Sequence, residues 1–156
     1  MTREEIHQRF VDEFCKDQHS PVLDPKEFLN AELALNTLLP ESYISFIRTH
    51  GPVSTPAILG LAVDKEAPFF DIMQIWPVSE CVSATQLYWS GGMSKELVGF
   101  ATDSGGNLFC FRRQGGGSRP DDAPVWLFDH DFCKDSKVTD SFDSWLLSYL
   151  KLRNLD

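Results

Sequence analysis

The segment Leu97–Phe111, LVGFATDSGGNLFCF, carries the clearest strand signal in the chain and sets the class of fold. Leu97–Ala101 and Leu108–Phe111 are short apolar runs, which predict two strands. The residues between them, TDSGGN at 102–107, favour a hairpin turn because Gly and Asn tolerate the backbone angles of such turns. The segment therefore predicts an antiparallel pair of strands.

Other strands are expected on both sides of this hairpin. Val125–Phe128 is apolar on both faces, which is typical of a central strand. Residues 57–63 and 69–76 are apolar runs bounded by Pro and Gly, and we interpret both as strands. Between the hairpin and Val125, residues 114–122 read QGGGSRPDD and predict a flexible polar loop.

Three helices are predicted ahead of the strands. Residues 1–20 favour an amphipathic helix that begins with a capping box at Thr2 and Glu5 and ends near residues 16–18. Asp24 followed by Pro25 marks the start of a second helix, which runs to about Asn36. Residues 40–50 form the third, and the following Gly51-Pro52 ends it.

Two further helices are predicted, one between the strands at residues 78–88 and one at the end of the chain. Asp140-Ser141 caps the closing helix, and its apolar positions follow the spacing of one helical face: Phe142, Trp145, Leu146, Tyr149 and Leu150. This order of elements predicts an α+β fold with N-terminal helices and a mostly antiparallel sheet of about 5–6 strands. The C-terminal helix is expected to pack on one side of the sheet. No linker or repeat interrupts the chain, so residues 1–156 are interpreted as a single domain.

The charge balance favours a basic protein as partner. Fourteen basic residues against 23 acidic ones give a net charge of −9, which repels a nucleic-acid backbone and speeds encounter with a basic surface. An acidic surface that serves only solubility is an equally acceptable interpretation.

Localisation is predicted from the N-terminus, the apolar runs and the cysteines. The N-terminus, MTREEIHQRF, has no secretory apolar stretch, and no run has the length that a membrane span needs. The cysteines are scattered, without a short C-x-x-C spacing. A cytoplasmic protein with reduced thiols and no membrane contact is therefore expected.

Motifs that resemble catalytic sites have simpler interpretations. Asp103-Ser104-Gly105-Gly106 is similar to the segment around a trypsin-like nucleophile, but the required base and its orienting group are missing, and a hairpin turn explains it. The glycines at 115–117 lack the Lys-Ser/Thr ending of a phosphate-binding loop. We expect no catalytic residue and no cofactor, and hence no enzyme.

A metal site and a carboxylate pair are also disfavoured. His130 and Cys133 could join Cys110 around zinc, but structural zinc sites usually show paired short spacings. Asp129 with Asp131 could share one face of a strand, as a glycosidase pair requires, yet acidic residues are frequent enough here for such pairs to arise by chance. No metal is expected.

Partner binding is assigned to acidic residues expected to be exposed and to two tryptophans that could act as surface anchors, although for each tryptophan a place in the core is favoured. These candidates are Asp64, Glu66, Asp71, Trp76, Trp89, Asp121, Asp122, Asp129 and Asp131. Reversing the charge of Asp121 and Asp122 is expected to leave folding intact.

Two segments resemble the hallmarks of the SUKH superfamily. Leu33–Pro52, LALNTLLPESYISFIRTHGP, is similar to the first, in which a Leu-Pro pair, an acidic residue and an aromatic residue open a helix. Residues 99–131 are similar to the second, in which a strand, an Asp-x-x-Gly-Asn turn, a second strand and an apolar strand ending in Asp-His follow one another. Ser141-Phe142 followed by Trp145-Leu146 matches the closing helix, so the resemblance spans about residues 24–152.

This resemblance implies an α+β fold that acts by binding. The superfamily includes fungal cell-wall assembly regulators and many bacterial immunity proteins that neutralise polymorphic toxins. The resemblance therefore implies an immunity protein that occludes a cognate toxin, and many such toxins are basic nucleases. The alternative that it implies is a non-enzymatic interaction or regulatory domain similar to the fungal relatives. The toxin, the contact surface and the oligomeric state stay open.

Overall fold

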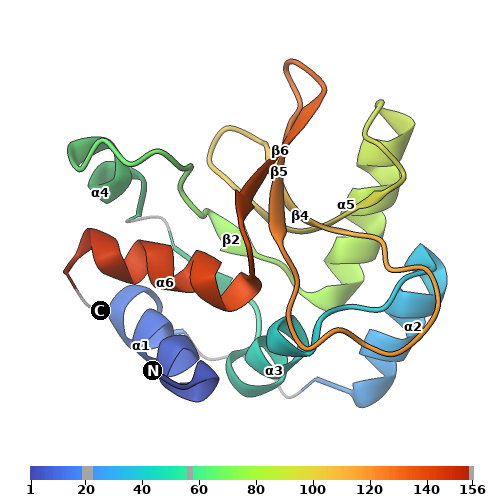
Figure 1. The fold of residues 1–156 in the computed structure, drawn as a ribbon, viewed down its shortest axis with the longest axis horizontal. Coiled ribbons are helices and arrows are strands. Elements are labelled where there is room, and N and C mark those ends of the chain that lie inside the picture. The colour runs from blue at the N-terminus through green and yellow to red at the C-terminus, as the bar shows by residue number, and fades with distance from the viewer. Residues whose placement is uncertain (19–22, 56–57, 155–156) are drawn as a thin grey trace.

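The computed structural model describes residues 1–18, 23–55 and 58–154 (Figure 1). In chain order the elements are α1 (Arg3–Phe14), α2 (Pro25–Leu35), α3 (Glu41–His50), β1 (Val53–Ser54), α4 (Ile58–Asp64), β2 (Gln74–Ile75), α5 (Val78–Ser90), β3 (Leu97–Thr102), β4 (Leu108–Arg112), β5 (Val125–Asp129), β6 (Lys134–Thr139) and α6 (Phe142–Leu152). The strands form one antiparallel sheet in the order β1-β2-β3-β4-β5-β6, so each strand pairs with the next in sequence. This confirms the predicted α+β class.

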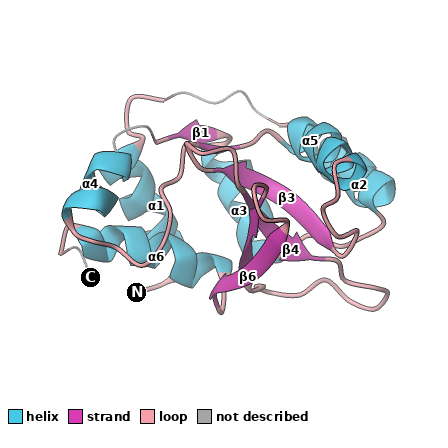
Figure 2. Ribbon diagram, turned by 90° about the horizontal axis from the view of Figure 1, so that it is seen from above, coloured by secondary structure: helices cyan, strands magenta, loops and turns pink. Residues whose placement is uncertain are grey.

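Helices cover both faces of the sheet (Figure 2). On one face lies α6, as predicted: its Trp145 packs 5.3 Å from the ring of Phe100 and 4.8 Å from that of Phe109. On the other face lies α5, whose Thr85 hydroxyl accepts a hydrogen bond from the Gly99 amide at 2.9 Å. The α2 helix packs on α5, and α1 packs on α6.

Gly99 permits the close approach of α5 to the sheet. A Cβ atom at this position would lie 3.0 Å from the Leu108 side chain and 3.3 Å from the Trp76 ring. The missing side chain therefore leaves the space that the indole of Trp76 fills, and Trp76 is 6% exposed.

The helix boundaries follow the local signals of the sequence. The capping box of Thr2 and Glu5 begins α1, which ends at Phe14, before the predicted residues 16–18. Asp24 caps α2, and Asn36 ends it in the left-handed conformation. Pro40 is the N-cap of α3 and not its first helical residue. None of the described helices is both long and apolar enough to cross a lipid bilayer.

The strand predictions are wrong in two places. The run at 57–63 is predicted to be a strand, but Ile58–Asp64 forms α4, and residue 57 lies outside the described residues. Ile58 and Ala62 are buried while Leu59 and Val63 are exposed, which is a helical alternation that a short apolar run does not reveal. The run at 69–76 contributes only the two residues of β2 to the sheet.

Two strands were missed because they carry little apolar signal. β6 is a polar edge strand, and most of its side chains are exposed. It forms because it pairs with β5, which lies between β4 and β6 as the prediction of a central strand requires. β1 has only two residues and pairs with β2.

Polar contacts fix α1 on the rest of the fold. Arg3 Nε donates to Asp143 at 2.8 Å, and the Arg3 guanidinium also contacts Asp121. His7, which is 2% exposed, places Nε2 2.8 Å from the other oxygen of Asp143. Burial alone would raise the pKa of Asp143, but the hydrogen bonds with His7 and Arg3 outweigh it and lower the pKa below its ordinary value of 3.8.

Because of this pKa shift, the free energy of unfolding depends on pH in the acid range. A carboxyl with a lower pKa in the folded state adds stability that is fully present above its ordinary pKa and is lost as the pH falls through the folded value. We expect Asp143→Asn to lower the free energy of unfolding by about 1 to 2 kcal/mol at neutral pH. The variant should also show a shallower loss of stability than the wild type below about pH 4.

Urea melts of the wild type and of Asp143→Asn at a series of acid pH values would measure both effects. Glu96→Gln is the matched control, because Glu96 is exposed and its carboxylate pairs with no cation in the described chain. Parallel stability curves for the wild type and Asp143→Asn in acid would contradict the assignment.

Candidate partner-binding site

Three connections meet at one end of the sheet: the β3–β4 hairpin, the β5–β6 hairpin and the α5–β3 loop. The Tyr88 hydroxyl near the end of α5 donates to the Gly106 carbonyl at 2.7 Å. A Cβ atom at Gly106 would lie 3.4 Å from the His130 ring, and one at Gly92 would lie 3.9 Å from the Cys133 sulfur. We call this region the loop end; it comprises residues 87–92, 103–107 and 128–133. Figure 1 shows the β5–β6 hairpin projecting from the body beside the end of α5.

Asp103 organises the β3–β4 turn. This carboxylate is 2% exposed, and its Oδ1 accepts from the amides of Gly105 and Asn107 at 2.8 and 2.9 Å. Gly106 follows with a φ of 85°, a left-handed conformation that glycine adopts without strain. Ser104 donates its hydroxyl to Asp71 at 3.1 Å and has no histidine partner among the described residues. The segment that resembles a protease nucleophile is therefore a turn.

Asn107 joins the two hairpins. Its Nδ2 donates to Asp103 at 3.0 Å, so its Oδ1 faces the β5–β6 hairpin. There Oδ1 accepts from the backbone amide of His130 at 3.2 Å and lies 2.8 Å from His130 Nδ1. Because an amide oxygen only accepts hydrogen bonds, Nδ1 of His130 carries the proton of this contact. The Asp-x-x-x-Asn turn and the Asp-His ending of β5 are thus parts of one hydrogen-bonded connection.

Removing this connection should loosen the β5–β6 hairpin. We expect Asn107→Ala to lower the free energy of unfolding by about 1 to 3 kcal/mol, because Asp103 and His130 both lose a partner. Amide hydrogen exchange of residues 129–134 should become faster. The control Asn30→Ala removes an exposed amide on α2. Unchanged exchange in Asn107→Ala would show that the two hairpins hold their positions independently.

A groove opens beside this connection. It has a volume of about 350 Å³ and is lined by Leu87, Tyr88, Gly91, Phe128 and His130. Leu87 at its edge is 69% exposed, and Phe132 at the tip of the β5–β6 hairpin is 72% exposed. Large apolar side chains that are exposed in this way are typical of interaction sites.

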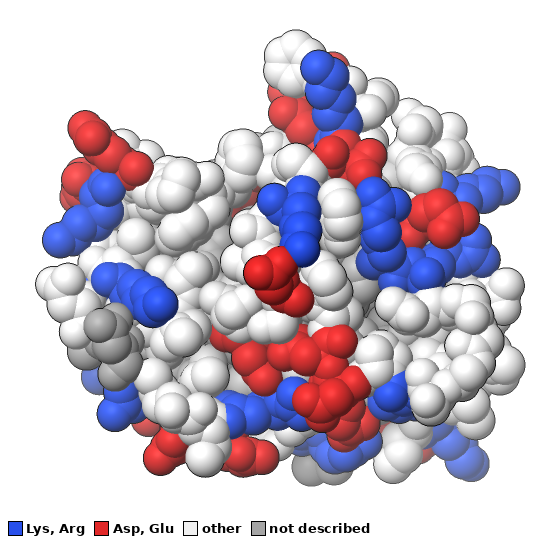
Figure 3. Space-filling view, viewed as in Figure 1, with Lys and Arg blue, Asp and Glu red and all other residues white. Residues whose placement is uncertain are grey.

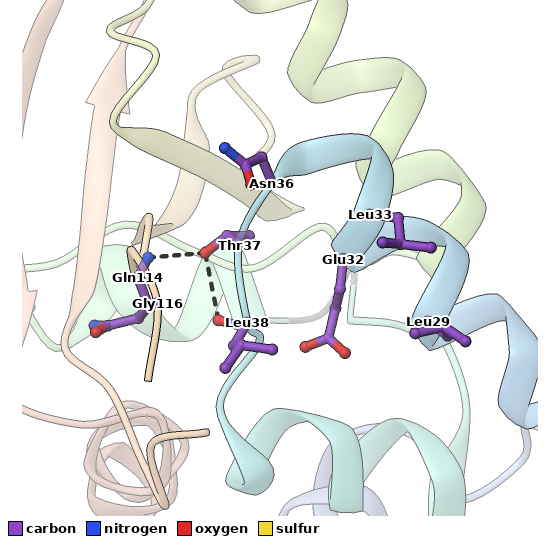
Figure 4. A pocket seen from close by; sticks show the side chains of 8 residues that line it. All are labelled: Leu29, Glu32, Leu33, Asn36, Thr37, Leu38, Gln114 and Gly116. Atoms are coloured by element: carbon purple, nitrogen blue, oxygen red, sulfur yellow. Dashed lines mark hydrogen bonds between the residues drawn. The ribbon is translucent and has the colours of Figure 1, made fainter. Parts of the chain in front are cut away.

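A second groove lies between α2 and the loop at 114–122 (Figure 4). It has a volume of about 200 Å³, and Leu29 and Leu33 on its α2 side are 57% and 71% exposed. The predicted flexible loop is anchored at both ends, since Gln114 donates its amide to Thr37 and Arg119 pairs with Glu32. The groove is therefore preformed.

The predicted partner-binding residues are not brought together. Asp64 and Glu66 lie at and just after the end of α4, whereas Asp129 and Asp131 belong to the β5–β6 hairpin. The Asp121 side chain is 82% exposed but pairs with Arg3. Figure 3 shows one group of acidic side chains low in the centre of this face, with Lys and Arg beside it, while the other acidic residues are scattered among basic ones.

The expected exposure of Asp71 and Asp122 is wrong. Asp71 is 6% exposed and accepts a hydrogen bond from Ser104, whereas Trp76 is 6% exposed over Gly99, in the core position that was favoured for it. The Asp122 side chain is 19% exposed and accepts from Ser42 and from the first amide of α6. Charge reversal at Asp122 would therefore disturb the fold. Trp89 is half-buried, and its Nε1 donates to the Leu97 carbonyl at 2.8 Å.

Phe132 and Leu87 were missed by the sequence analysis. The sequence signal for Phe132 was an aromatic residue in a charged turn after an apolar strand. In the sequence, Leu87 is only one apolar position of a predicted helix, and the packing of α5 on the sheet decides that its side chain is exposed.

The residues considered for zinc do not form a site. Cys110 is fully buried in the sheet, whereas Cys133 is exposed, and no group of three potential ligands exists among the described residues. Burial raises the pKa of the Cys110 thiol well above its ordinary value, so this thiol stays protonated and is a poor metal ligand.

Residues 23–148 match the model of the SMI1 / KNR4 family (SUKH-1), a span that includes the whole sheet and leaves α1 outside. No curated protein matches the chain.

Proposed function

Because the chain belongs to the SMI1/KNR4 (SUKH-1) family, a branch of the SUKH superfamily, we propose that it is an immunity protein that binds a cognate protein toxin and blocks it by occlusion. The observation that carries this proposal is the family match over the whole sheet. The family is consistent with immunity proteins and with regulatory domains, and both act by binding.

The charge of the chain supports a basic toxin. A net charge of −9 raises the rate of encounter with a basic partner, and nucleases that bind phosphate backbones are such partners. The loop end supports binding in a second way, because it exposes apolar side chains on a rigid base.

Co-expression tests the proposal. The gene beside that of this chain would be expressed in a host alone and together with this chain, and growth would be followed. We expect the neighbouring product to be toxic alone and harmless with the chain, and the two proteins to co-purify. Toxicity that persists together with a failure to co-purify would reject the proposal.

A regulatory interaction domain is the second candidate, since the family is equally consistent with such a role. It would be favoured by a neighbouring gene product without toxicity. In that case the chain should co-purify with a host protein and not with the neighbour.

A further inference from the structure

We infer that the loop end is the surface that contacts the basic protein partner, with Phe132 as its central anchor and Asp129 and Asp131 beside it. This inference rests on the proposed function and adds the location of the interface. Neither the family match nor the net charge says which surface of the chain binds the partner.

The first argument is the apolar surface. Phe132 and Leu87 are among the three most exposed large hydrophobic side chains of the described residues, at 72% and 69%. Leu87 lines a groove together with Tyr88, Phe128 and His130, and Phe132 lies two residues beyond His130 at the hairpin tip. Interfaces usually depend on a few such anchors, and aromatic residues are frequent among them.

The second argument is that the tip of the β5–β6 hairpin is held in one conformation. Asp129 Oδ1 accepts from the amides of Asp131 and Phe132 at 3.0 and 3.3 Å. Asn107 holds His130 through two contacts from the neighbouring hairpin. A protruding segment that is already ordered loses less conformational entropy when it enters a cleft of a partner.

The third argument is charge. The Asp131 side chain is 75% exposed, and its one contact with a basic side chain in the described chain is with Nε2 of His130 at 3.3 Å. Asp129 has no ion pair in the described chain and stands opposite Lys134 in the sheet. The two carboxylates beside an exposed aromatic ring therefore suit a basic surface that has an apolar pocket.

The groove at α2 suits a basic partner less well. Its carboxylate, Glu32, is 7% exposed and is neutralised by Arg119. Leu33 on that groove is 71% exposed, close to the value of Phe132, and provides a matched control. Asp17, just after α1, provides the control for Asp131, because it is also an exposed aspartate.

The experiment measures binding to a catalytically inactive variant of the toxin encoded beside this chain. We expect Phe132→Ala to weaken the equilibrium binding about 30-fold or more, as removal of a central anchor does. Asp131→Lys should slow association about tenfold at low salt and less at high salt. Leu33→Ala and Asp17→Lys should stay within about twofold of the wild type. Hydrogen exchange of the complex should show protection of residues 128–134 and 86–92.

The outcomes separate the two proposals. Thermal melts confirm first that each variant is folded. If the wild type binds and Phe132→Ala binds within about threefold of it, the loop end is excluded while the proposed function stands. A loss of binding in Leu33→Ala, with Phe132→Ala unaffected, would place the interface at α2 and overturn the inference. No binding by the wild type would overturn the proposed function and this inference together.

Discussion

Trp145→Ala is expected to lower the free energy of unfolding by about 3 to 5 kcal/mol. Trp145 is fully buried, and its ring packs against Phe100, Phe109 and Tyr149 at centroid distances of 5.3, 4.8 and 5.7 Å. Alanine removes these contacts and leaves a cavity between α6 and the sheet that the neighbouring rings can fill only in part. Equilibrium denaturation in urea measures the change.

Trp145→Phe separates the packing contribution from that of the indole N–H. The Nε1 atom of Trp145 is buried and has no hydrogen-bond partner among the described residues, so phenylalanine removes a polar group that contributes little to stability. We expect this variant to lose less than half of what Trp145→Ala loses. A loss under about 1 kcal/mol for Trp145→Ala would show that the packing of α6 on the sheet is misassigned.

Arg119→Ala is expected to lower the free energy of unfolding by about 3 kcal/mol, because it leaves a buried carboxylate without its counter-charge. Arg119 Nη2 donates to Glu32 at 2.9 Å, and its Nη1 donates to the Leu39 carbonyl at 2.8 Å. Glu32 also accepts from the Leu39 amide at 2.7 Å. The Arg119–Glu32 pair therefore joins α2, the segment just before α3 and the loop at 114–122.

A double-mutant cycle with Glu32→Gln tests this pairing. The double variant should be more stable than the sum of the single losses predicts, because the neutral amide that Glu32→Gln introduces needs no counter-charge. Arg48→Ala is the control: the Arg48 side chain is 63% exposed and lies 3.9 Å from Glu41, so its loss should cost less than about 0.5 kcal/mol. Strict additivity in the cycle would contradict the coupling.

The sequence predicted the elements whose signals are local. The capping residues Thr2, Asp24 and Ser141 begin helices as expected, and the turn at 102–107 joins two strands. These predictions are confirmed because a cap or a turn depends on the hydrogen bonds and backbone angles of a few neighbouring residues. The family resemblance is confirmed for the same reason, since its motifs are such local signals in a fixed order.

Prediction of the site residues from the sequence was less successful. Asp71 was expected at the surface, yet it is buried and accepts a hydrogen bond from Ser104, which is distant in sequence. Trp76 was considered as a surface anchor with the core favoured, and it lies in the core over Gly99. Phe132, in contrast, is an aromatic residue that the fold leaves exposed. Exposure is a property of the assembled surface, and hydropathy alone does not give it.

By itself, the sequence determined the class of fold, the positions of most helices, the central hairpin and the family. Only the tertiary structure decided that 58–64 is helical, that the polar segment 134–139 is an edge strand, and that Asn107 joins His130 to Asp103. The physical reason is distance along the chain: helix caps and turns are fixed by neighbouring residues, whereas strand pairing, burial and the contacts between hairpins depend on residues that meet only after folding.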